Sequence, residues 1–140
     1  MHCAGGDIRT KLFQSPLAGK PEKNDAVFVS LEDIRTVLDR NLLTCILCCR
    51  AVAPEMMDRK SGKIVTIGSI AGLKGIEKST IYATSKAALH HYTRCLAVQL
   101  KPYNVNVNSV APGDIVTERW KASRDYEKEK MVTDGTLDRY

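Results

Sequence analysis

The sequence lacks any apolar run approaching the roughly 20 residues that a helix needs to cross a bilayer. Its first seven residues also lack the basic stretch followed by an apolar stretch that is typical of a secretory signal. These absences argue against a membrane-spanning helix and predict a cytoplasmic protein. With 44% hydrophobic residues, the chain has enough apolar material for a folded core.

A concentrated basic patch is also missing. The chain carries 21 Lys and Arg against 16 Asp and Glu, a formal net charge of +5. Basic and acidic side chains balance within residues 118–140, so the excess is scattered over residues 1–117. Nucleic-acid binding requires a patch as well as a basic total, so we expect no nucleic-acid partner.

The cysteines do not form a pattern of disulfides or metal ligands. There are five, an odd number, which makes a disulfide framework improbable. Cys45, Cys48 and Cys49 are closely spaced, but the second pair of ligands that a zinc site normally needs is missing. We expect no metal site and interpret the three residues as small hydrophobic side chains on one buried helical face.

Alternating helix and strand patterns predict an α/β fold. After an irregular region over residues 6–29, Ser30 and Asp33 form a capping box, and the predicted elements are a helix to about residue 59, a strand at 63–67, a helix at 80–101 and a strand at 104–110. Pro54 is expected to bend or end the first helix. This alternation predicts a parallel sheet, whose ligands collect beyond the carboxyl ends of the strands.

Chemically useful residues lie around those strand ends. Tyr82 and Lys86 are four residues apart on a helix and therefore share a face. A free tyrosine titrates near 10, and a neighbouring ammonium favours its phenolate, so the pair could act as a general acid and base. Ser69 follows the first strand, and Asn41 lies on the inward stripe of the other helix. Pro112 and Gly113 follow the second strand.

Together these stretches resemble the classical short-chain dehydrogenases/reductases. The matching segments are residues 3–5, 40–42, 62–72, 82–88 and 107–113, together with Thr117. The resemblance implies a Rossmann-like doubly wound parallel sheet, of which this chain supplies roughly the second half. It describes residues 1–140 as one partial domain, with a strand end at 1–5, an irregular loop at 6–29, a catalytic core at 30–117 and a charged lid at 118–140.

The resemblance also implies an enzyme that moves hydride between NAD or NADP and an alcohol or carbonyl substrate. Tyr82 would then exchange the proton with the substrate oxygen, and Ser69 would hydrogen-bond that oxygen. Lys86 would favour the Tyr82 phenolate and hold the nicotinamide ribose, while Asn41 would position a water in the proton relay. The implied cofactor-binding residues are Ala4, Gly5, Tyr82, Lys86, Pro112, Gly113, Ile115 and Thr117. By the same resemblance the protein forms a homo-oligomer, a dimer or tetramer.

The sequence also departs from the family pattern. The Gly-rich turn that binds the cofactor pyrophosphate in this family is absent from the chain. We therefore read the chain as a fragment, a truncated gene model or a chain numbered from an internal start, inactive by itself. A non-catalytic scaffold with this fold is the alternative. Gly68 stands where the family often has serine, which we interpret as harmless, and His90 is interpreted as structural or solvent-facing.

Overall fold

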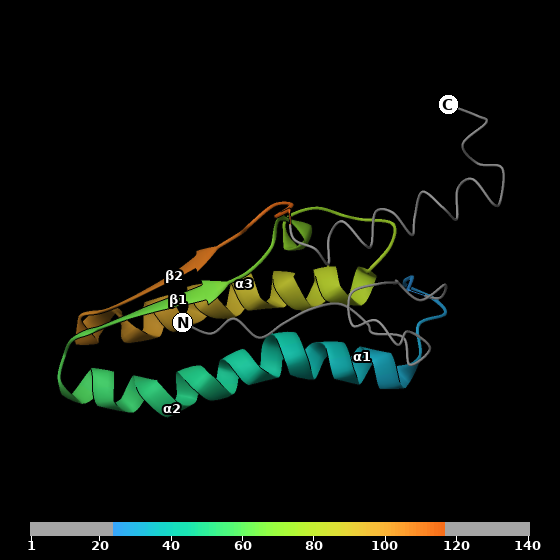
Figure 1. The fold of residues 1–140 in the computed structure, drawn as a ribbon. Helices are drawn as coiled ribbons and strands as arrows, with labels where there is room; N and C mark the ends of the chain where they lie inside the picture. The colour runs from blue at the N-terminus through green and yellow to red at the C-terminus, as the bar shows by residue number, and fades with distance from the viewer. Residues whose placement is uncertain (1–23, 117–140) are drawn as a thin grey trace, which may run out of the picture. The chain divides into compact units, whose positions relative to one another are not determined.

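The computed structural model describes residues 24–116 (Figure 1). Residues 24–113 lie within one compact unit, whereas residues 114–116 fall in a second unit. Several predictions therefore lie outside the described residues, namely those for the strand end at 1–5, most of the loop at 6–29, and the lid at 118–140.

A long helical segment opens the first unit. It consists of α1 (Leu31–Leu38), a π-helical segment η1 (Asp39–Leu43) and α2 (Thr44–Asp58). The capping box is confirmed, because the backbone N–H of Asp33 donates to Ser30 Oγ at 3.1 Å and that hydroxyl donates to Asp33 Oδ2 at 2.7 Å. Pro54 lies within α2, which continues to Asp58, close to the predicted helix end at about residue 59.

The π-helical segment was not predicted from the sequence. The N–H of Thr44 bonds to the carbonyl of Asp39, five residues earlier, which adds one residue to that turn. Two side chains bond to carbonyls four residues before them. Asn41 Nδ2 donates to the Val37 carbonyl at 2.9 Å, and Thr44 Oγ1 donates to the Arg40 carbonyl at 2.7 Å. The widened turn is therefore centred on a predicted site residue, Asn41.

Two parallel strands and a crossover helix complete the unit. Strand β1 (Gly62–Ile67) leads through a 3-10 turn, η2 (Ile70–Gly72), into α3 (Thr80–Leu100), and a second 3-10 turn, η3 (Lys101–Tyr103), precedes β2 (Val105–Val110). The strands pair in register from Gly62 with Val105 to Ile67 with Val110. The predicted strands and second helix are thus confirmed to within one residue, and the fold is an incomplete parallel α/β Rossmann-like fold.

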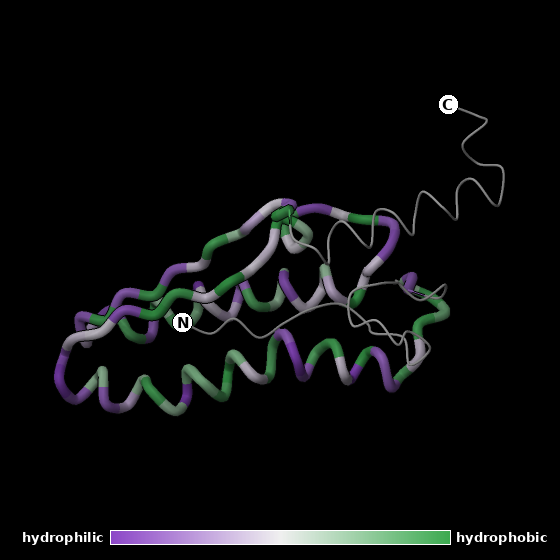
Figure 2. The backbone as a smooth tube through the Cα atoms, viewed as in Figure 1, coloured by the Kyte–Doolittle hydropathy of each residue, from purple (hydrophilic) through white to green (hydrophobic). Residues whose placement is uncertain are grey.

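The helices lie on one side of the sheet (Figure 1). In β2 the buried Val105 and Val107 alternate with the exposed Asn106 and Asn108, an alternation that Figure 2 shows as a change of colour along the strand. The core between sheet and helices comprises Cys45, Cys49, Ala53, Ile64, Leu89, Leu96, Leu100, Val105 and Val107. Cys48 is exposed, so the prediction that all three neighbouring cysteines share a buried face was wrong for this residue.

Candidate active site

The loops that follow β1 and β2 are bonded to each other. The N–H of Gly68 donates to the Val110 carbonyl at 2.7 Å, and the N–H of Ile70 donates to the Pro112 carbonyl at 3.1 Å. These bonds continue the pairing of the two strands beyond their carboxyl ends. They place Ser69, between the two donors, beside the loop that contains Pro112 and Gly113, as the sequence predicted for the mouth of a parallel sheet.

Ser69 itself is held in a defined conformation. Its backbone is extended, with φ −167° and ψ 150°, and it caps η2. Its Oγ accepts a hydrogen bond from the N–H of Ala71 at 3.1 Å. Because the hydroxyl is the acceptor in that bond, its own proton can be donated to a further oxygen.

Tyr82 and Lys86 meet on the first turns of α3, as predicted. The Lys86 ammonium lies 5.6 Å from the centroid of the Tyr82 ring, within the range of a cation–π contact. Lys86 is 4% exposed, and its Nζ donates to the Ile67 carbonyl at 3.0 Å. The lysine therefore joins the tyrosine helix to the end of β1, immediately before the serine loop.

The start of α3 is fixed by the segment that precedes α1. Ser79, the N-cap residue, adopts a left-handed conformation with φ 62°. Its N–H donates to the Asn24 carbonyl at 2.7 Å, and Asn24 Nδ2 donates to Ser79 Oγ at 3.2 Å. These contacts hold the turn that carries Tyr82, three residues further on, and no local pattern in the sequence indicates them.

The electrostatics of Lys86 follow from its burial. Removal from water lowers the pKa of Lys86, and only a Cys45 thiolate would oppose that effect. A hydrogen bond with Cys49, together with burial, raises the pKa of Cys45, so Cys45 stays a neutral thiol. The ammonium of Lys86 thus lies in a low-dielectric site, and no thiolate offsets the free-energy cost of its desolvation.

Asn41 lies on the helix face that α3 covers. It is 1% exposed, in the π-helical segment, and that segment packs against α3. Cys45, which is one turn further along, is close enough to interact electrostatically with Lys86. The structure therefore puts Asn41, Ser69, Tyr82 and Lys86 on elements that pack together.

Only some of the other predicted cofactor-binding residues lie in the first unit. Pro112 and Gly113 lie beside the serine loop, as described above. Ala4, Gly5 and Thr117 lie outside the described residues, and Ile115 belongs to the second unit. Within residues 24–116 no group of three or more His, Cys, Asp or Glu side chains could hold a metal ion. No helix in this described part is long and apolar enough to cross a membrane.

Sequence reasoning gave His90 no part in this site. It is 8% exposed, and its imidazole lies within hydrogen-bonding distance of the Ser69 backbone and the Ser109 hydroxyl. Its position one helical turn after Lys86, itself one turn after Tyr82, was the available signal, because residues four apart share a face.

Replacing Lys86 with Met is expected to change how stability depends on pH. Below the folded-state pKa of Lys86 both states keep the proton, and the folded state bears the desolvation cost. As the pH rises through that value towards 10.5, the ordinary value for lysine, the folded state loses its proton first. The unfolded chain then binds more protons, so the wild-type chain gains stability relative to Lys86→Met.

Urea unfolding of both chains between about pH 7 and about pH 11 measures this gain. Lys63→Met, at an exposed strand position, is the matched control. Wild type should show no comparable gain in stability relative to this variant as the pH rises. A free-energy difference between wild type and Lys86→Met that stays constant over this range would contradict the prediction.

Comparison with known proteins agrees with this geometry. The family model for short chain dehydrogenases matches residues 17–128. The cyclohexanol dehydrogenase of Rhodococcus sp. (strain TK6) is 46% identical over 104 residues, covering 72% of this chain and 38% of that protein. The 3-oxoacyl-[acyl-carrier-protein] reductase of Bos taurus is 36% identical over 123 residues, covering 88% of this chain and 51% of that protein.

Solved structures give the same result. ElxO with NADP bound superposes with a TM-score of 0.74 at 25% identity, covering 90% of this chain and 46% of that one. A 3-oxoacyl-[acyl-carrier protein] reductase from Brucella melitensis with bound NAD gives a TM-score of 0.67 at 31% identity, covering 82% and 41%. The chain thus spans about half the length, or less, of these relatives. Since the family model covers most of its residues, the chain belongs to the short-chain dehydrogenase family.

Proposed function

We propose that this chain supplies the catalytic half of an NAD(P)-dependent oxidoreductase that interconverts an alcohol and a carbonyl compound. The observation that carries the proposal is the buried Lys86 ammonium, held at the carboxyl end of β1 beside Tyr82. Burial of a lysine ammonium costs free energy, so a buried lysine indicates that its charge has a role at that place. Here the ammonium faces the ring of Tyr82, the proposed general acid and base.

The proposed proton transfer uses two hydroxyl groups. Ser69 donates its hydroxyl proton to the substrate oxygen and so holds the reacting carbon near Tyr82. Tyr82 gives its phenolic proton to that oxygen in reduction and takes it back in oxidation. The Lys86 ammonium stabilises the phenolate that forms, because the opposite charges lie in a site of low dielectric constant. Asn41, in the widened helical turn, positions the water from which the proton is replenished.

The described residues fit the nicotinamide ribose. Among them, the Lys86 ammonium donates one hydrogen bond, to the Ile67 carbonyl, and an ammonium has three N–H groups. The remaining donors can bind ribose hydroxyls, and the loop of Pro112 and Gly113 lies at the same edge. When bound, the cofactor supplies or accepts the hydride. Ala4, Gly5, Ile115 and Thr117 are proposed as further contacts from the resemblance alone.

A scaffold without catalytic activity is the second candidate. A scaffold would have no physical use for a lysine that is 4% exposed next to a tyrosine. A hydrophobic side chain would fill that space at a lower desolvation cost. The geometry therefore supports the enzyme better than the scaffold.

Exposed apolar side chains on α2 and α3 support the further proposal of a homo-oligomer. Leu47 and Val52 on α2 are 49% and 43% exposed, and Val98 on α3 is 74% exposed. Burial of such side chains against a second copy would be favourable. Sedimentation of the purified protein should then show a dimer or tetramer, and a monomer at all concentrations would contradict this assignment.

The proposed function is tested in a chimera, in which this chain replaces the matching segment of the Rhodococcus cyclohexanol dehydrogenase. The relative supplies the remaining part of its own fold, while all four proposed catalytic residues come from this chain. We expect turnover with NAD or NADP of a secondary alcohol, such as cyclohexanol, or of a 3-oxoacyl thioester. A folded chimera that binds cofactor but reduces and oxidises none of these compounds would favour the scaffold.

A further inference from the structure

We propose that His90 is a positioning residue that fixes the backbone of Ser69, and that Gly68 is present because the His90 ring occupies the space of a side chain. The inference rests on the proposed function for the catalytic role of Ser69. The contacts themselves do not depend on that role, so they can be tested separately.

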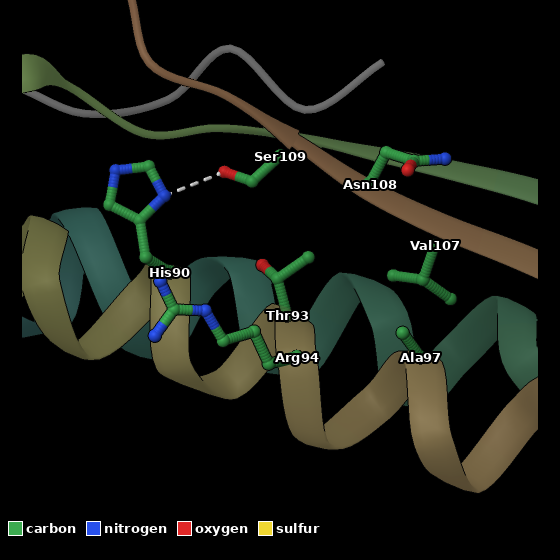
Figure 3. A pocket seen from close by; sticks show the side chains of 7 residues that line it. All are labelled: His90, Thr93, Arg94, Ala97, Val107, Asn108 and Ser109. Atoms are coloured by element: carbon green, nitrogen blue, oxygen red, sulfur yellow. Dashed lines mark hydrogen bonds between the residues drawn. The ribbon is translucent and has the colours of Figure 1, made fainter.

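The His90 ring bridges the loop after β1 and the end of β2. Its Nε2 lies 3.1 Å from the Ser69 carbonyl oxygen and 3.4 Å from the Ser69 backbone nitrogen. Its Nδ1 lies 3.0 Å from Ser109 Oγ, as Figure 3 shows. One imidazole thus reaches both backbone groups of Ser69 and ties them to the neighbouring strand.

Both neutral tautomers of the ring satisfy this arrangement. With the proton on Nε2, the ring donates to the Ser69 carbonyl and accepts from the Ser109 hydroxyl. With the proton on Nδ1, it donates to Ser109 Oγ and accepts from the Ser69 N–H. The shorter distance to the Ser69 carbonyl favours the first tautomer. Either way, the ring remains bonded to Ser69.

Gly68 fits the His90 ring closely. A Cβ atom at position 68 would lie 2.1 Å from His90 Cε1 and 2.5 Å from its Nε2. That separation is far below van der Waals contact, so any other residue at position 68 must displace the ring or the loop. The glycine at this position, where the family often has serine, is therefore coupled to His90.

The hydrogen bonds of His90 account for its position better than its packing does, because both ring nitrogens have partners. The ring borders a pocket of about 290 Å³ that is mixed in polarity, its other lining residues being Thr93, Arg94, Ala97, Val107, Asn108 and Ser109 (Figure 3). An apolar side chain at position 90 would leave Ser109 Oγ and the Ser69 backbone without their ring partner. The main consequence of losing the imidazole is thus that the Ser69 backbone is held less firmly.

Displacement of Ser69 would act on the reaction through the direction of its hydroxyl. The Oγ is already held by the Ala71 N–H, and the backbone is held by the two strand-like bonds on either side. His90 adds the only side-chain contact to the Ser69 backbone among the hydrogen bonds that the structure shows for residues 24–116. Its loss should therefore change kcat, because orientation is lost, more than it changes cofactor affinity.

The test compares His90→Leu, which has no hydrogen-bonding group, with His90→Gln, which keeps a donor and an acceptor. Hydrogen exchange by NMR on the chimera, without cofactor or substrate, is the readout that does not require activity. We expect exchange of the Ile70 and Ala71 amides, which donate to the Pro112 carbonyl and to Ser69 Oγ, to become roughly 10-fold faster in His90→Leu. The reason is that losing about one hydrogen bond to the Ser69 backbone loosens this loop. His90→Gln should restore most of the protection. His91→Leu, an exposed neighbour, is the control and should change neither amide.

The second readout is turnover in the chimera. His90→Leu should lower kcat on the order of 10- to 100-fold with little change in the cofactor Kd, and His90→Gln should recover most of the loss. Gly68→Ala with His90 intact should speed the same amide exchange, which keeps the proposal testable if His90→Leu does not fold. Unchanged exchange at Ile70 and Ala71 in the foldable variants overturns the proposal. An inactive wild-type chimera in which these two amides exchange slowly would instead overturn the proposed function alone.

Discussion

Replacing Tyr82 with Phe in the chimera should reduce turnover by about 10²- to 10⁴-fold while leaving cofactor binding largely unchanged. The substitution deletes only the phenolic oxygen that exchanges the proton. The ring that faces the Lys86 ammonium at 5.6 Å remains, so the position of the lysine should persist. Steady-state rates in both directions, together with cofactor titration by fluorescence, measure the two effects separately.

Tyr92→Phe is the matched control for this experiment. Tyr92 is also on α3, where burial raises its pKa to about 12, so it is not suited to proton exchange near neutral pH. Removing its hydroxyl should leave turnover nearly unchanged. Near-normal activity in Tyr82→Phe, or an equal loss in Tyr92→Phe, would contradict the assignment of Tyr82 as general acid and base.

The elements that could be predicted from sequence are those with a strong local pattern. The period of α3, the alternation in β2 and the capping box at Ser30 each depend on residues close together in the chain. The pair Tyr82 and Lys86 was predictable for the same reason. Each of these features is decided within one or two turns of helix or one strand, and the structure reproduces all of them.

The features that were missed depend on contacts between distant residues or on small changes of helical geometry. His90 and Ser69 are 21 residues apart, and Asn24 and Ser79 are 55 apart, so periodicity within one element carries no information about either pair. The π-helical segment leaves its neighbours helical on both sides, so an apolar stripe passes through it almost unchanged. The sequence thus indicated the site residues themselves, and the structure identifies the contacts that hold them in place.

The 1–140 chain by itself should bind neither NADH nor NADPH tightly and should show no turnover. The cofactor pyrophosphate requires backbone N–H donors from a Gly-rich turn at a helix N-terminus, and the sequence contains no such turn. Contacts to the nicotinamide half remain, but they leave the two phosphate charges without their main partners. Isothermal titration calorimetry with each cofactor measures this, with the chimera as the control that contains a complete binding site.

The sheet gives a second reason to expect this result. Within residues 24–116 it has two strands, each paired on one side, and Val65 and Val110 are 44% and 50% exposed. Unpaired edges and exposed apolar side chains favour association, so the isolated chain should be poorly soluble or should assemble with other chains that cover this surface. Micromolar binding of either cofactor by a soluble monomer would contradict both expectations, because the 1–140 chain would then provide a pyrophosphate site without the Gly-rich turn.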